Sequence, residues 1–167
     1  FQEQRRGRYI ADIAIGQDIW EIQTRAFHRL RGKLDTFLKE YHVTVIYPVA
    51  VEKKIYWLEQ ETGKITGGRR SPRRGCAYDV FHELYAIRPY LQDPNFSIHI
   101  VLMDMEEYKP LNGWSRDKKR GASRYDRLPG KLRDIVRIEG ISDYACFLPE
   151  DLPEEFTSKD LAKSARI

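Results

Sequence analysis

Two kinds of hydrophobic pattern follow one another at the start of the chain. Apolar and small or polar residues alternate from Arg8 to Ile15, a turn can form at 16–18, and the alternation resumes from Ile19 to Thr24. Because successive side chains point to opposite faces of a strand, this pattern predicts a β-hairpin. Thr24 is a candidate N-cap for an amphipathic helix. The apolar residues of this predicted helix recur at steps of three and four: Phe27, Leu30, Leu34, Phe37, Leu38 and Tyr41.

Later apolar runs extend this pattern into a sheet. They predict a central strand, a further strand, a helix, a buried strand and a last strand, at residues 42–51, 53–60, 80–91, 95–105 and 132–138. Pro48 favours a strand end or bulge, and Pro89 a bend or end of the helix. The order β-β-α-β-β-α-β predicts an α/β fold, a mixed β-sheet flanked by helices.

The character of the sequence changes after Gly140. A short helix is expected at 142–148, a linker between Pro149 and Pro153, and a capped helix from Phe156. We therefore expect one domain over 1–140 and a linker with helices over 141–167. The last helix resembles the opening of a winged helix-turn-helix, which would place a recognition helix beyond Ile167. A terminal helix that docks on the sheet is the alternative.

Composition limits the class of protein. The 167 residues are 41% apolar, enough for a core, and no apolar run approaches the roughly 18 residues of a membrane-spanning helix. The two cysteines, Cys76 and Cys146, lack metal-ligand spacing and are expected to be free thiols of a cytoplasmic protein. The first residues contain neither an initiator Met nor a signal peptide, so we expect a fragment of a longer or trimmed protein.

Basic residues concentrate in two stretches, at 64–75 and 116–133. Both are rich in Gly, Ser and Pro, which predicts loops. Basic loops suit a nucleic-acid backbone, because each cation that meets a phosphate releases counterions. Ordinary solvated charge is the alternative. The residues expected to contact nucleic acid, DNA in particular, are Arg69, Arg70, Arg73, Arg74, Lys118, Lys119 and Arg120.

Candidate chemistry lies on the predicted hairpin, which carries Asp12 on its first strand and Glu21 and Gln23 on its second. A tight turn brings the two strands together, so the two carboxylates are expected to converge. Paired carboxylates suit Mg²⁺, which needs few protein oxygens and leaves positions for water and a substrate phosphate. The four histidines are scattered, and the glycines lack the spacing of a nucleotide-binding loop.

The sequence Asp12, then Glu21-Ile22-Gln23, then an amphipathic helix and an apolar strand resembles the PD-(D/E)XK nuclease superfamily over residues 8–105. The resemblance implies a restriction-endonuclease-like fold in which Asp12 and Glu21 bind Mg²⁺ or Mn²⁺. It places Gln23 at the position of the motif lysine, which orients the attacking water. Gln23 carries no charge, and Lys33 on the following helix is a candidate substitute.

Three hypotheses follow. The first is a metal-dependent phosphodiesterase that acts on DNA and assembles as a homodimer to cut both strands, with Asp12, Glu21, Gln23 and Lys33 at its catalytic site. The second is a catalytically inactive module of the same fold that binds DNA or regulates another protein. The third is a protein-interaction domain, which would be favoured if nucleic-acid binding were absent.

Overall fold

The computed structural model describes residues 3–59, 61–110 and 126–165. The chain forms two compact units. Unit 1 comprises 1–47, 77–100 and 136–167, and unit 2 comprises 48–76 and 101–135. Long strands of one sheet run from one unit into the other, and the fold is mixed α/β, as predicted.

Unit 1 begins with short antiparallel strands. Strand β1 (Gln4–Arg6) pairs with β2 (Tyr9–Ala11), and β3 (Ile13–Ile15) pairs with β4 (Asp18–Ile22). The predicted hairpin is therefore confirmed as β3–β4. Its first strand is interrupted at Asp12, where the backbone bends between β2 and β3.

The helix after the hairpin starts later than predicted. A 3₁₀ turn, η1 (Phe27–Leu30), leads into α1 (Arg31–Phe37). The prediction that Thr24 caps the helix is wrong, because Ala26 holds the cap position with a φ of 59° and no side-chain cap. The apolar face is as predicted, since Phe27, Leu34 and Phe37 are completely buried.

Strand β5 (His42–Leu58) is one continuous strand where two were predicted. Pro48 lies inside it. On one edge β5 pairs in parallel with β4 over 42–46 and antiparallel with β6 (Ile65–Arg70) over 54–58. Pro48 falls between these two partners on that edge, where the missing N–H breaks neither ladder.

The second half of unit 1 is built from short helical turns. Segments η2 (Ala77–Val80), α2 (Phe81–Leu84) and η3 (Tyr85–Tyr90) replace the single predicted helix, with a non-helical backbone at Ile87 ahead of Pro89. The Glu83 carboxylate accepts the Phe27 N–H at 3.0 Å and so ties α2 to η1.

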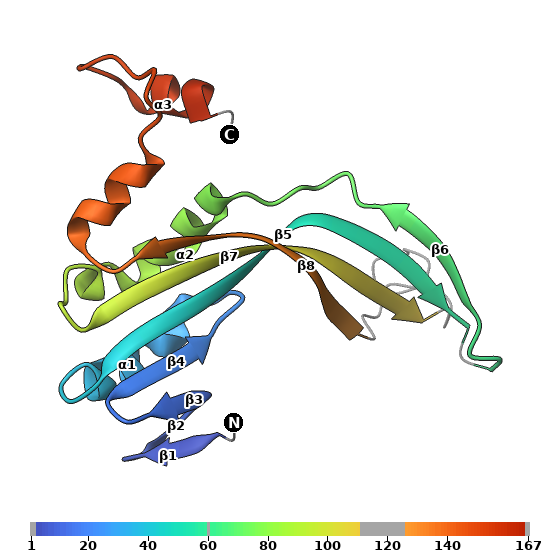
Figure 1. Cartoon of the computed structure of the whole chain (residues 1–167), viewed down its shortest axis with the longest axis horizontal. Helices are drawn as coiled ribbons and strands as arrows, with labels where there is room; N and C mark the ends of the chain where they lie inside the picture. The colour runs from blue at the N-terminus through green and yellow to red at the C-terminus, as the bar shows by residue number, and fades with distance from the viewer. Residues whose placement is uncertain (1–2, 60, 111–125, 166–167) are drawn as a thin grey trace. The chain divides into compact units, whose positions relative to one another are not determined.

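The remaining strands complete the sheet. Strand β7 (Phe96–Pro110) and β8 (Asp126–Ile138) are longer than predicted, and the order is β3-β4-β5-β7-β8 with β6 beside β5. Figure 1 shows β4, β5 and β7 pointing the same way and β8 running in the opposite direction. The predicted C-terminal helices are present as η4 (Ile141–Phe147) and α3 (Ser158–Ala165).

The basic stretches are only partly loops. Residues 65–70 of the first form β6, with a bulge near Tyr56 where Gly67 and Gly68 have φ values of 106° and 88°. Residues 126–133 of the second belong to β8, and 111–125 lie outside the described residues. Strand formation was missed because two glycines normally weaken a strand, whereas here they supply the bulge.

Within the described ranges, no helix is long and apolar enough to cross a membrane. Neither Cys76 nor Cys146 forms a disulfide bond within the described ranges. The domain boundary near residue 140 and the winged-helix interpretation of α3 stay predictions.

Candidate functional site

The candidate site in unit 1 forms where the β3–β4 hairpin opens. The last antiparallel pair of the hairpin joins Ile13 to Trp20. Asp12 follows this pair at the bend between β2 and β3, and Glu21 follows it on β4, close enough for the charge of Asp12 to act on the Glu21 carboxyl. The carboxylate of Asp12 is fixed there because its Oδ2 accepts the backbone N–H of Ile22 at 2.8 Å. The two acids therefore lie near each other, although Asp12 is on a bend and not on the strand where the sequence placed it.

Glu21 is a charged group inside the protein. It is 2% exposed, and its Oε1 has no hydrogen-bond partner among the described residues. Burial raises the pKa of the Glu21 carboxyl above its usual value, and the nearby charge of Asp12 acts in the same direction, against the lowering effect of Lys33. An unsatisfied buried oxygen beside a second carboxylate is an arrangement that a cation would relieve.

Lys33 reaches this carboxylate from α1. Its Nζ lies 2.6 Å from Glu21 Oε2, and its side chain is 23% exposed. Lys33 precedes the buried Leu34 on the helix, so its long side chain follows the edge of the apolar face to the end of β4. Asp12, Glu21 and Lys33 are thus brought together from a bend, a strand and a helix.

Gln23 lies at the same end of β4 but makes other contacts. Its backbone N–H donates to Ile46 O at 2.9 Å and continues the pairing with β5. Its side-chain amide donates to the carbonyl of Arg25. The side chain predicted to orient a water is therefore held by the turn that leads into η1.

A hollow of about 440 Å³ adjoins this end of β4. Its lining supplies two guanidinium groups and one amide beside mostly exposed backbone, a chemistry suited to an anionic ligand. The residues that line it are Ile22, Gln23, Thr24, Arg25, Ala26 and Arg29.

The donor set fits a hard divalent cation that keeps most of its waters. No group of three or more His, Cys, Asp and Glu side chains is assembled for a metal in the described part of the chain. Two carboxylates, those of Asp12 and Glu21, are the number that Mg²⁺ commonly takes from a protein when a substrate phosphate and waters supply the rest.

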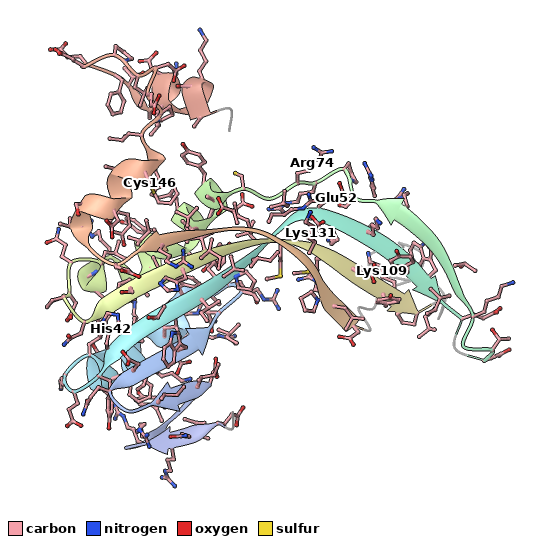
Figure 2. The ribbon with its side chains drawn as sticks, in the orientation of Figure 1. His42, Glu52, Arg74, Lys109, Lys131 and Cys146 are labelled. Carbon is pink, nitrogen blue, oxygen red and sulfur yellow. The ribbon has the colours of Figure 1, made fainter. Side chains whose placement is uncertain are left out.

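Unit 2 carries the predicted basic residues of the first stretch. Arg69 and Arg70 lie on β6 and are exposed, and Arg70 Nε is 3.3 Å from Glu52 Oε1. Arg73 and Arg74 are exposed on the segment that follows β6, where Figure 2 labels Arg74. The remaining predicted contacts, Lys118, Lys119 and Arg120, lie outside the described residues.

Two arrangements were missed by sequence reasoning. Ser97 Oγ and His42 Nε2 are 3.0 Å apart, which satisfies a serine that is 1% exposed. In unit 2, Glu107 collects three cations from three strands. Strand alternation places Glu107 and Lys109 on one face of a strand, which could have indicated part of the second group. The other two cations, Lys53 and Arg127, are far from Glu107 in sequence.

Comparison with known proteins supplies relatives but no activity. An uncharacterized protein of Treponema pallidum (strain Nichols) is 29% identical over 152 residues, which is 87% of this chain. The chain spans 58% of the length of that relative. No solved structure matches the chain. Residues 1–139 match a domain of unknown function, DUF8091, and the chain therefore belongs to the DUF8091 family.

Proposed function

We propose that this chain is a metal-dependent phosphodiesterase domain of the PD-(D/E)XK type that cleaves DNA. Asp12 and Glu21 hold Mg²⁺ or Mn²⁺, and Lys33 takes the role of the motif lysine. The observation that carries the proposal is the convergence of Asp12, buried Glu21 and Lys33, with Nζ 2.6 Å from the Glu21 carboxylate. The antiparallel hairpin β3–β4, followed by a helix and the parallel strand β5, supports the restriction-endonuclease-like order.

Each residue has a separate task. Asp12, held by the Ile22 N–H, and Glu21 provide oxygen ligands at the mouth of the hairpin. When bound, the cation polarises a phosphoryl oxygen and lowers the pKa of a bound water. Lys33 donates hydrogen bonds to oxygen atoms beside Glu21, and its positive charge stabilises negative charge on the phosphate. Arg25 and Arg29 in the adjoining hollow position the neighbouring phosphates.

A silent DNA-binding module is the second candidate. The neutral Gln23 at the lysine position, with its amide engaged by the Arg25 carbonyl, favours this alternative. In that case the ion pair of Glu21 with Lys33 has only a structural role, which is to stabilise the fold. We also propose a cytoplasmic location, from the two cysteines without a disulfide, and for the first candidate a homodimer that cuts both strands.

The test is cleavage of supercoiled DNA by the full-length parent protein in Mg²⁺ or Mn²⁺. Asp12→Asn and Glu21→Gln are compared with Asp18→Asn, an exposed aspartate on the same hairpin. We expect cleavage to be lost in the first two variants and kept in the third, with DNA binding and folding retained in all. DNA binding without any cleavage by the wild-type protein would establish the silent module instead.

A further inference from the structure

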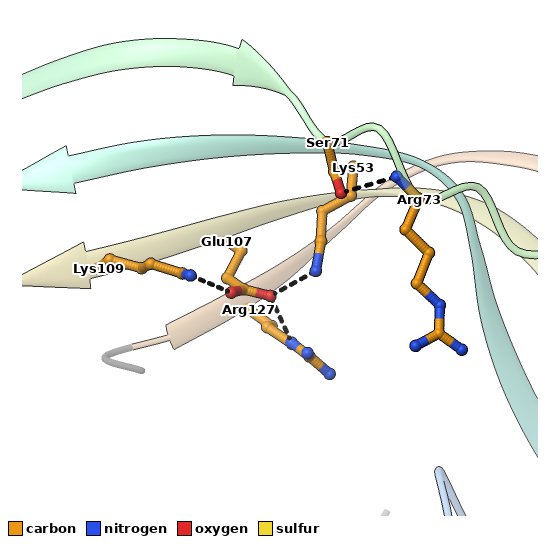
Figure 3. Close-up of polar contacts among 6 residues, drawn as sticks. All are labelled: Lys53, Ser71, Arg73, Glu107, Lys109 and Arg127. Atoms are coloured by element: carbon orange, nitrogen blue, oxygen red, sulfur yellow. Dashed lines mark hydrogen bonds and ion pairs between the residues drawn. The ribbon is translucent and has the colours of Figure 1, made fainter. Parts of the chain in front are cut away.

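Unit 2 contains a cluster of four charged side chains that the proposed catalytic site does not use. Glu107 on β7 is 4% exposed and meets Lys53 Nζ at 3.0 Å, Lys109 Nζ at 3.4 Å and Arg127 Nε at 3.1 Å. These residues, shown in Figure 3, are called the Glu107 cluster below. Three cations surround one carboxylate, so the cluster keeps a net charge of about +2.

The three cations of the cluster stay partly exposed to solvent although each pairs with Glu107. Lys53, Lys109 and Arg127 remain 22%, 25% and 35% exposed at their side chains. Arg127 meets Glu107 through Nε, and Figure 3 shows its guanidinium extending beyond the carboxylate. Three like charges held this close repel one another, and an anion on the open side would offset that repulsion. The lowered pKa of Glu107, about 2, shows how positive the surroundings are.

Neighbouring residues extend the cluster along the sheet. The backbone N–H of Ser71 donates to the Lys53 carbonyl at 2.7 Å, which holds the segment after β6 against β5. Figure 3 shows the exposed Arg73 side chain extending to the same side as Lys53. Lys109 Nζ lies 5.9 Å from the centre of the Trp57 ring. Cations spread over several strands beside an aromatic ring suit a run of phosphates and a base better than one small anion.

We propose that the Glu107 cluster is a phosphate-binding site for a nucleic-acid backbone, with Lys53, Lys109 and Arg127 as donors, Glu107 as the positioning residue and Arg73 as a flanking contact. The choice of nucleic acid as the source of phosphate rests on the proposed function. The binding itself needs neither a divalent metal nor cleavage.

The experiment measures DNA affinity of the full-length protein in EDTA over a range of salt concentrations. Lys53→Gln with Arg127→Gln is compared with Lys54→Gln and Lys131→Gln, which remove the same charge from the same strands. The control lysines act on Asp104 and not on Glu107. We expect the test variant to lower the salt slope by about two and affinity by about 10- to 60-fold at 0.1 M salt. The control should change both much less.

A second measurement covers the case in which the test variant unfolds. In a folded Trp20→Phe, Trp114→Phe variant of these 167 residues, Trp57 is the remaining tryptophan. Its emission should change on titration with an oligonucleotide and return as salt is raised, and Lys53→Arg should preserve the change. The proposal would be overturned if the test and control variants lost DNA affinity equally. It would also be overturned if the emission of Trp57 did not change on titration with the oligonucleotide. Cleavage with an unaltered salt slope would refute this site alone, whereas an altered slope without cleavage would refute the catalytic proposal alone.

Discussion

Replacing Lys33 by Met removes the partner of a buried charge. Glu21 is 2% exposed, its Oε2 is 2.6 Å from Lys33 Nζ, and its Oε1 has no partner in the described chain. Breaking a buried pair while leaving one charge behind costs about 3 to 5 kcal/mol. Because the Lys33 side chain is 23% exposed and water can relax there, we expect about 3 kcal/mol at pH 7. For a chain of this size the melting temperature should fall by roughly 6 to 12 °C.

The pH dependence separates this cause from ordinary packing loss. The pKa of Glu21 is already raised in the folded protein, and loss of Lys33 raises it further. A group with a raised folded pKa favours the fold below its unfolded pKa, and that contribution is lost as pH rises through the folded pKa. The difference between Lys33→Met and wild type should therefore shrink to roughly 1 kcal/mol as pH falls to 4, because the raised pKa favours the neutral form of Glu21 there.

The assay is chemical denaturation at pH 4 and pH 7. Lys39→Met, which changes an exposed lysine close to the same helix, should stay within about 0.5 kcal/mol of wild type. Adding Glu21→Gln to Lys33→Met should recover most of the loss, since no charge is then buried. If Lys33→Met lost the same free energy of unfolding at both pH values, or if the double variant recovered none of it, the buried charge of Glu21 would not be the cause.

Three further outcomes can be measured by denaturation. Glu107→Gln should lower the free energy of unfolding by roughly 2 to 3 kcal/mol at pH 7. The pKa of Glu107 is depressed to about 2, so its ionised carboxylate stabilises the fold above pH 4.5 and loses this effect as pH falls toward 2. The same loss of stability at pH 2.5 as at pH 7 would contradict this prediction. Tyr144→Phe should be neutral or stabilising by up to about 1 kcal/mol, because its buried hydroxyl has no partner among the described residues, whereas Tyr78→Phe should cost about 1 kcal/mol; the reverse order would contradict the assignment. Ala26→Gly should stabilise by roughly 0.5 to 1 kcal/mol, because the φ of 59° strains alanine, and a loss would show that the methyl group packs usefully.

The sequence predicted those parts of the fold that depend on local periodicity. Alternation around Gly16 located the hairpin and so brought Asp12 near Glu21. The three- and four-residue spacing of apolar side chains located α1. Lys33 could be named as a candidate because it flanks that apolar face.

The missed features depend on contacts distant in sequence. A strand that continues through Pro48 without an end or bulge there could be expected only if β5 was known to change partners at that point. The strand β6 relies on a glycine bulge against β5. The Glu107 cluster draws its cations from three strands, so no short stretch of sequence contains its pattern.

The most direct test of the central claim is Mn²⁺ binding to the full-length protein, followed by electron paramagnetic resonance. We expect one Mn²⁺ site in the wild-type protein, with binding weakened in Asp12→Asn and Glu21→Gln and unchanged in Asp18→Asn. Lys33→Met should still bind Mn²⁺, because both carboxylates are kept, while cleavage is lost. Mn²⁺ bound equally by wild type, Asp12→Asn and Glu21→Gln, or not bound by the wild type, would contradict the account.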